Sequence, residues 1–398
     1  MKKEFGYFAK RAIRPKLIDT SVDPRTSGVI TIPACGEPHI IRTLESLAAC
    51  HSPSGVFEII ILINHGALAS PEVKAMSHHS AIQVSEWIAN HTFLNLRYYV
   101  LSAFELTKKE YGVGNARKIL MDEAARRLVA KDKVQAPIIG LDADCLVSKN
   151  YLVEIESYFQ KNVDIQACSI HFEHHLEGLD MLQKKAIIQY EKHLRYYIDA
   201  QRMAGFPFAY QTIGSSMAVR CIDYMKQGGM NRRQAGEDFY FLQKFIELGH
   251  FGELNSTTVY PSGRVSDRVP FGTGKAVKDA LQQNGEVYTY HLQSFKDIKV
   301  LFDAVDSLWS MDSGGVEQFL ETVSRSVNLF LYQFDFVDVI NDIKSNTSSK
   351  NTFNKRFFRW FNAFMLMKYL HYARDHFYPN QPVELMIEEL SKWKDIGR

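Results

Sequence analysis

Short apolar runs alternate with amphipathic stretches over the first 150 residues of the chain. The runs are β-branched or almost continuously apolar, which predicts strands covered on both faces, at 28–33, 57–63, 96–101 and 137–141. Between them, apolar residues recur at helical spacing and predict helices over 36–50, 67–95 and 112–130. Strands that alternate with helices predict an α/β domain with a mostly parallel sheet flanked by helices.

The rest of the chain has a different pattern. Helices are predicted over about 180–200 and 236–250, and a polar loop rich in Ser, Gly and Arg follows at 259–276. Past about residue 280 the sequence indicates acidic and aromatic helices without strong strands. The pattern predicts three parts: an N-terminal extension (1–27), an α/β domain (28–278) and a helical C-terminal region (279–398).

Composition places the chain among ordinary globular enzymes. Of 398 residues, 46% are hydrophobic and 23% charged. A formal charge of +2 is too small to favour nucleic acid as a partner. The five cysteines form no C-x-x-C pair, so neither a zinc nor a disulfide framework is expected, which suits a reducing cytosol.

No stretch resembles a signal peptide or reaches the ~18–20 apolar residues that a spanning helix needs. We therefore expect a cytoplasmic protein. The aromatic and basic stretch 355–378 leaves two interpretations open. Packing of its apolar face onto its own domain is favoured, and peripheral contact with the inner face of a membrane is the alternative.

Two carboxylates, Asp142 and Asp144, directly follow the apolar run 137–141. Residues two apart in an extended segment point to the same side, so both side chains can face one ligand. Parallel sheets bind ligands at the carboxyl ends of their strands. A turn would also account for the two aspartates, but their position favours a divalent cation that holds a diphosphate.

Further charged residues lie in the later segments. Glu237 and Asp238 begin a predicted helix, where the helix dipole alone would favour acids; with the earlier pair, one of them is a candidate general base. Arg264 and Arg268 lie in the polar loop, either as solvated arginines or as a clamp for a diphosphate. The stretch 272–276 is no P-loop, because it lacks the first glycine and the Ser or Thr.

Five stretches, taken together and in order, resemble family 2 glycosyltransferases. They are VITIPACGEPHIIRTLESL, NARKILMDEAARRL, LDADCLVSKNYL, GSSMAVR and GGMNRRQAGEDFYFLQKF, and they span roughly residues 28–275. The resemblance implies a GT-A fold that transfers a sugar, with inversion, from a nucleotide-diphosphate donor of the UDP-sugar type. It implies a glycan, lipid-linked or other hydroxyl acceptor, and a role in polysaccharide biosynthesis.

The resemblance also implies roles for particular residues. Asp142 and Asp144 match the pair that holds Mn2+ or Mg2+, and Asp238, with Glu237 beside it, matches the acids that supply the base. The residues expected at the donor are Pro33, Glu37, Asn64, Arg117, Asp142, Gly214, Arg264 and Arg268.

The chain departs from the family pattern at two places. Asn64 and His65 stand where the family has an aspartate that reads the nucleobase. The histidine that often follows the acidic pair is missing, and Arg264 or Arg268 is expected to assist the diphosphate instead. The alternative is a catalytically inactive protein that binds a sugar nucleotide or scaffolds a synthase. The intact acids at 142, 144, 237 and 238 favour the enzyme.

Overall fold

The computed structural model describes residues 6–8, 10, 16–233, 236–265 and 272–396, which form two compact units. The first unit contains the described residues of Met1–Glu177 and Thr212–Gly263. The second contains those of Gly178–Gln211, Arg264–Asp267 and Gly272–Arg398. Residues 178–211, which the predicted boundaries place in the α/β domain, thus pack with the C-terminal helices.

An eight-stranded sheet forms the centre of the first unit, in the order β3-β2-β1-β4-β7-β6-β8-β5. Strands β1, β2, β3 and β4 run parallel to one another, as do β6 and β8, whereas β7 and β5 pair antiparallel with their neighbours. The strands are β1 (Thr26–Ala34), β2 (Val56–Gly66), β3 (Leu96–Leu106), β4 (Pro137–Gly140), β5 (Leu146–Val147), β6 (Ala167–Phe172), β7 (Met217–Arg220) and β8 (Phe251–Tyr260).

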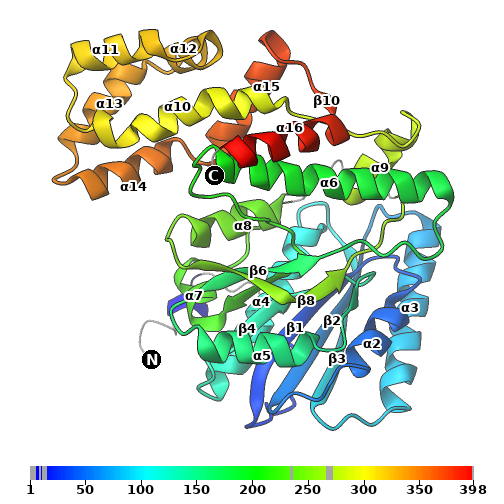
Figure 1. The fold of residues 1–398 in the computed structure, drawn as a ribbon. Helices are drawn as coiled ribbons and strands as arrows, with labels where there is room; N and C mark the ends of the chain where they lie inside the picture. Colours follow the sequence, from blue (N-terminus) through cyan, green and yellow to red (C-terminus); the bar gives the residue numbers. More distant parts are fainter. Residues whose placement is uncertain (1–5, 9, 11–15, 234–235, 266–271, 397–398) are drawn as a thin grey trace. The chain divides into compact units, whose positions relative to one another are not determined.

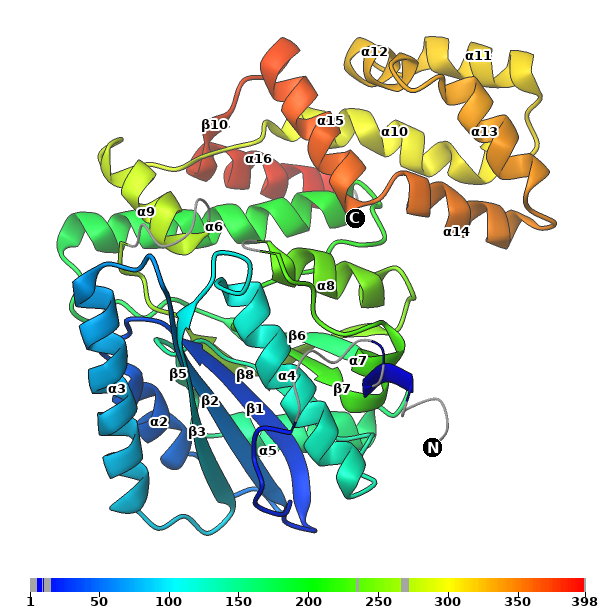
Figure 2. The ribbon, with the colours of Figure 1, turned by 180° about the vertical axis from the view of Figure 1, so that it is seen from behind.

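Helices cover both faces of this sheet, with α4 on one face and α2, α3 and α5 on the other (Figures 1 and 2). All eleven residues of β2 are buried, as expected of a parallel strand between two layers. The helices of the first unit are α2 (Ile40–Ala48), α3 (Pro71–Ala89), α4 (Val113–Ala130), α5 (Tyr151–Lys161), α7 (Cys221–Lys226) and α8 (Glu237–Ile246).

The second unit is almost entirely helical. Its longest helix, α6 (Met181–Met203), begins with a capping box between Asp180 and Gln183. The other helices are α9 (Thr273–Leu281), α10 (Leu292–Leu308), α11 (Ser313–Thr322), α12 (Arg325–Tyr332), α13 (Phe336–Ser345), α14 (Lys350–Trp360), α15 (Ala363–His376) and α16 (Val383–Ile396). Two short strands, β9 (Tyr288–Thr289) and β10 (Gln381–Pro382), pair antiparallel.

The stretch 355–378 packs its apolar side chains inside the second unit. Phe357, Phe361, Leu366 and Tyr369 are all buried, which agrees with the favoured interpretation of this stretch. Among the described helices, none combines the length and the apolar character that crossing a membrane requires.

The architecture confirms the predicted fold class, a mostly parallel Rossmann-like sheet flanked by helices with a helical C-terminal region, as expected of a GT-A fold. Four strands of this sheet, β5, β6, β7 and β8, have no counterpart in the sequence-based prediction. They supply the half of the sheet that contains its antiparallel pairs, and β7 joins this half to β4. Strand β7 (MAVR) has only four residues, and strand β8 (FGELNSTTVY) mixes polar and apolar residues. Neither sequence therefore has a clear strand pattern.

Candidate functional site

Two predicted site residues follow the end of β4, near the middle of the sheet. Asp142 and Asp144 lie in the turn that leads from β4 into β5, and both are partly exposed. Pro33 lies near the end of β1 and Asn64 near the end of β2, the strands parallel to β4. The carboxyl ends of these strands meet at one edge, so this edge carries the first group of predicted residues.

Arg117 links the turn after β4 to helix α8. It lies in the second turn of α4, and its side chain is only 5% exposed. Its Nη2 is 2.6 Å from Oδ1 of Asp142, and its Nε is 3.1 Å from Oε1 of Glu237. Its Nη1 donates to the carbonyl of Gly214 at 2.9 Å. The guanidinium therefore holds three separate segments together at one point.

Helix α8 brings the second pair of predicted acids to the same place. Gly236 precedes it in the left-handed conformation (φ 70°), which glycine adopts without strain. Glu237 is buried against Arg117, whereas Asp238 is half-buried. The Oδ2 of Asp238 accepts a hydrogen bond from the N–H of Gly214 at 2.9 Å. The two neighbouring acids thus have different surroundings, and of the two only Asp238 is partly accessible to solvent.

Gly214 lies where a larger residue does not fit. A Cβ at this position would be 2.7 Å from Nη2 of Arg117 and 3.2 Å from Cβ of Asp238. Because Arg117 is held by three partners, its side chain has little freedom to move away. The glycine allows Arg117 and Asp238 to approach the same backbone segment.

We call Asp142, Asp144, Glu237 and Asp238, together with Arg117, the carboxylate cluster. Burial and neighbouring charges alter the pKa values of Glu237, Asp238 and Arg117. Burial raises the pKa of Asp238, and the negative charge of Asp142 adds to the rise, although Arg117 and two backbone N–H groups oppose it. Burial likewise raises the pKa of Glu237, in part offset by Arg117. Burial would lower the pKa of Arg117, but the three carboxylates outweigh it and raise that pKa. A carboxylate with a raised pKa is a stronger base.

Two of the predicted donor residues point into the protein. Glu37 is 2% exposed, and its Oε1 accepts from the N–H of His39 in its own loop. Asn64 is buried, with its carbonyl accepting from the hydroxyl of Ser77. Their contact with a nucleoside stays a prediction.

Tyr111 was not among the residues predicted from the sequence. It is 39% exposed, and its hydroxyl lies 3.5 Å from Sγ of Cys35, just after β1. A Cβ at Gly66 would lie 2.9 Å from its ring, so the ring covers the end of β2. No motif surrounds Tyr111 in the sequence, and only the glycine at the end of a strand hints at a close neighbour.

The carboxylates fit a cation that brings its other ligands with it. Within the described part of the chain, no group of three or more His, Cys, Asp or Glu side chains is arranged to hold a metal ion. Asp142 and Asp144 alone supply two carboxylates, which is what Mg2+ commonly takes from a protein when phosphates and water complete its shell. Asp142 is 37% exposed, although its Oδ1 is bonded to Arg117.

The structure describes one of the two arginines predicted to clamp a diphosphate. Arg264 is half-buried beyond the end of β8. Arg268 lies outside the described residues. Their proposed contact with a diphosphate stays a prediction.

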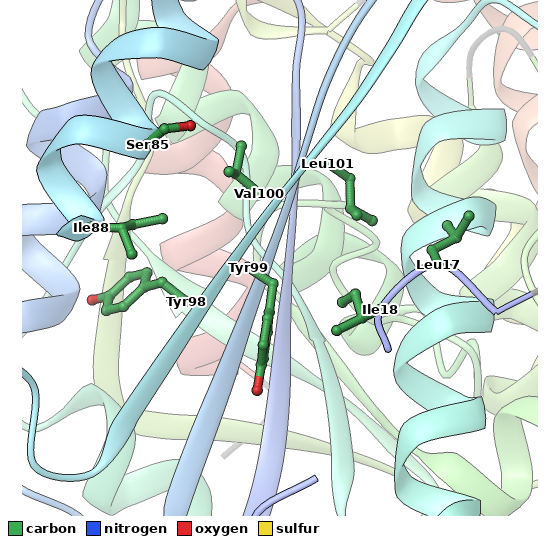
Figure 3. A pocket seen from close by; sticks show the side chains of 8 residues that line it. All are labelled: Leu17, Ile18, Ser85, Ile88, Tyr98, Tyr99, Val100 and Leu101. Carbon is green, nitrogen blue, oxygen red and sulfur yellow. The ribbon is translucent and has the colours of Figure 1, made fainter. Parts of the chain in front are cut away.

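A cavity of about 330 Å³ lies elsewhere, on the edge strand β3 (Figure 3). Tyr98 and Val100 point to the side of α3, and Tyr99 and Leu101 point to the side of Leu17. Its remaining lining residues are Ile18, Ser85 and Ile88. No carboxylate or basic side chain lines it, so this cavity lacks the chemistry of the carboxylate cluster.

Neither a protein-family model nor a curated protein sequence matches the chain. Solved structures that are similar to it include S. aureus TarS 1–349, the same fragment in complex with UDP-GlcNAc, and the same fragment in complex with UDP. Their TM-scores are 0.41, 0.43 and 0.41 at 12% sequence identity. Each alignment covers 84% of this chain and 92% of the other. A likeness this distant carries no argument about function, which rests on the residues of the chain itself.

Proposed function

We propose that the protein is an inverting glycosyltransferase that uses a nucleoside-diphosphate sugar and a hydroxyl acceptor. The observation that carries the proposal is the convergence of Asp142, Glu237 and Asp238 on Arg117 and Gly214. These residues come from four separate segments of the sequence: helix α4, the turn after β4, the segment before β7, and the start of α8. Burial raises the pKa values of Glu237 and Asp238, and acids whose pKa is shifted by burial beside a specific charge partner are typical of catalytic sites.

Asp142 and Asp144 are the proposed ligands of Mn2+ or Mg2+. When bound there, the cation would offset the charge of the departing nucleoside diphosphate. The residues fit this role because they are partly exposed at a sheet edge and are two carboxylates rather than a complete set of ligands.

Asp238 is the proposed general base. It takes the proton of the acceptor hydroxyl while the acceptor oxygen forms a bond to the anomeric carbon and the bond from that carbon to the diphosphate breaks. The N–H groups of Gly214 and Phe239 fix the orientation of its carboxylate, each donating to one oxygen. Its raised pKa brings the carboxylate closer to the proton affinity that general-base catalysis at neutral pH favours.

Glu237 and Arg117 act as positioning residues in this scheme. Both side chains are 5% exposed, so neither presents its charged group openly to a substrate. Arg117 joins Glu237 on one side to Asp142 on the other, at 3.1 and 2.6 Å. The ion pairs therefore fix the start of α8, which carries Asp238, relative to the turn that carries the proposed metal ligands.

The proposed partners follow from the resemblance of the sequence to family 2 glycosyltransferases. They are a UDP-sugar as donor and a glycan or lipid-linked hydroxyl as acceptor, in the synthesis of a polysaccharide. Peripheral contact with the inner face of a membrane would bring a lipid-linked acceptor within reach.

The ion pair between Arg117 and Asp142 also favours a second candidate, a sugar-nucleotide-binding protein without catalysis. In that case Arg117 permanently neutralises Asp142, and no cation is needed. Such a protein would bind the nucleotide equally well with and without metal. It would catalyse neither sugar transfer to an acceptor nor hydrolysis of the donor.

The test is a set of binding measurements on the whole protein with UDP-, GDP-, dTDP- and CMP-sugars, each with EDTA, Mg2+ or Mn2+. The thermal midpoint rises when a ligand binds the native state. We expect a rise with one nucleotide class only, and only with metal, together with slow hydrolysis of that donor in water. Binding that is equal in EDTA, with no hydrolysis, would support the second candidate; no binding to any donor would overturn both.

A further inference from the structure

A cavity of about 500 Å³ opens between α13 and α14 in the helical unit. This volume lies within the ~300–1,000 Å³ of small-molecule sites. Its lining contains three charged side chains, one indole and two aliphatic side chains, which are Asp338, Val339, Asp342, Ile343, Arg356 and Trp360. None of them belongs to the carboxylate cluster of the first unit, and the proposed transfer reaction uses none of them.

Each helix contributes two polar groups one turn apart. Asp338 and Asp342 lie on α13, and Arg356 and Trp360 lie on α14. Residues four apart on a helix lie on the same face, so the acids of one helix and the donors of the other border the same cavity.

The opposite charges across this cavity are not neutralised by each other. In the described part of the chain, neither Asp338 nor Arg356 takes part in an ion pair or a side-chain hydrogen bond. The carboxylate of Asp342 accepts a hydrogen bond from the side-chain amide of Asn346, at 3.2 Å. Within the described residues, the carboxylate of Asp338 and the guanidinium of Arg356 thus border the cavity without a protein partner, and both side chains are exposed.

Trp360 is the fixed apolar wall of the cavity. Its ring lies 5.8 Å from Phe336, 6.0 Å from Phe357 and 5.7 Å from Phe361, centroid to centroid. These contacts hold the indole in place while it stays half-buried. The buried side chain of Ile343 adds a second apolar surface.

We propose that this cavity binds a neutral saccharide. A sugar ring has an apolar C–H face that packs on an indole, and hydroxyl groups at its rim that both donate and accept. The hydroxyls would donate to Asp338 and Asp342 and accept from Arg356, which are charge-assisted hydrogen bonds. A ligand of one charge would instead meet a like charge on one side of the cavity. The site is independent of the donor site, and it would hold a glycan chain whether or not the chain is the acceptor.

The test measures the ¹⁹F NMR signal of Trp360 while a saccharide is added. The whole protein is labelled with 5-fluorotryptophan, which gives one ¹⁹F resonance for each of its four tryptophans, and Trp360→Phe assigns the resonance of interest. Cellotetraose, maltotetraose and chitotetraose are the probes. We expect saturable movement of the Trp360 resonance with at least one of them, while Trp87 in the first unit stays unchanged. UDP with Mn2+ should leave the Trp360 resonance in place, so failure at one site is distinguishable from failure at the other.

Matched variants separate the cavity from its surroundings. Asp338→Asn and Arg356→Ala should each weaken saccharide binding about tenfold. Asp335→Asn and Arg359→Ala, at exposed positions on the same segments but outside the lining, should leave the affinity unchanged. The proposal is overturned if no probe moves the Trp360 resonance, if Arg356→Ala binds the saccharide with wild-type affinity, or if only a zwitterion such as free lysine binds.

Discussion

Helix α4 carries two buried arginines that bind carboxylates in contrasting ways. Arg127 donates to both oxygens of Glu58 on β2, at 2.6 and 2.9 Å, and to the carbonyl of Thr20. That pair contains one cation and one anion, and both side chains are at most 3% exposed. Arg117, nearer the start of the helix, is shared between Asp142 and Glu237, with Asp238 close enough to influence its pKa.

The difference is one of charge balance and of access. The Arg127 site is neutral and closed, so it holds β2 to α4 and has no capacity left for a ligand. The Arg117 site has more acids than bases, and Asp142 is 37% exposed. A cation or a protonated group arriving there would relieve the surplus negative charge. We infer that the first site serves stability and the second serves function.

The largest effect is expected from Asp238→Asn. Removing a general base should lower the rate of donor turnover about 10²–10⁴-fold, because the acceptor then lacks a group to take its proton. The amide retains an oxygen for one of the two backbone N–H groups, so donor affinity should not change. Initial rates and calorimetric titration measure the two quantities.

Asp132→Asn provides the control for this variant. Asp132 is exposed and has φ 55°, a conformation that asparagine tolerates. Equal loss of rate in both variants, or near-normal turnover by Asp238→Asn, would show that Asp238 is not the base.

Arg127→Met should act on stability alone. It leaves Glu58 buried without a partner, which costs about 3–5 kcal/mol of the free energy of unfolding. Urea denaturation measures the loss, and titration of the folded variant with donor should give the wild-type affinity. A variant with normal stability and weakened donor binding would contradict the division between the two arginine sites.

Gly214→Ala should have a moderate effect on both properties. The added methyl group would lie 2.7 Å from Arg117, and forcing them apart costs roughly 1–3 kcal/mol. Gly314→Ala is the matched control, because its Cβ would have only one neighbour, at 3.8 Å, within helix α11. If Gly214→Ala behaves like the control in melting and turnover, the close packing around Arg117 is not required.

The smallest effect concerns the dependence of stability on pH. Burial raises the pKa of Asp238 above its unfolded value, so the native state is favoured while this group is protonated. That contribution is lost as pH rises through the raised pKa. Asp238→Asn should therefore melt a few degrees above wild type at neutral pH, and the difference should vanish as pH falls below about 3.8, the ordinary value for aspartate. A gain that is constant with pH would refute this cause.

The first four strands of the first unit can be predicted from the sequence because each contains a short, mostly apolar run. A central parallel strand such as β2 is buried on both faces, so its apolar run marks it directly. Strand β8 mixes buried and exposed positions and contains Asn255 and Ser256, so its sequence lacks a clear strand pattern. Residues 178–211 show the same limit, since their helix is evident but its association with the C-terminal helices depends on tertiary packing.

The site was predictable as a set of residues and not as a set of contacts. The positions of Asp142, Asp144, Glu237 and Asp238 follow from motifs at a strand end and a helix start. That Arg117 pairs with two of these acids depends on how α4 and α8 meet. Arg117 was expected to bind the donor, and its contacts with Asp142 and Glu237 were not foreseen.

The most direct test of the account compares Asp144→Asn with Glu58→Gln in calorimetric titrations with the UDP-sugar, in Mn2+ and in EDTA. Both variants remove one negative charge from the first unit, one at the open site and one at the closed site. We predict that Asp144→Asn loses at least about tenfold of the metal-dependent affinity, or ~1.4 kcal/mol, while Glu58→Gln binds like wild type. Unchanged metal-dependent affinity in Asp144→Asn would contradict the assignment of the carboxylate cluster as the donor site.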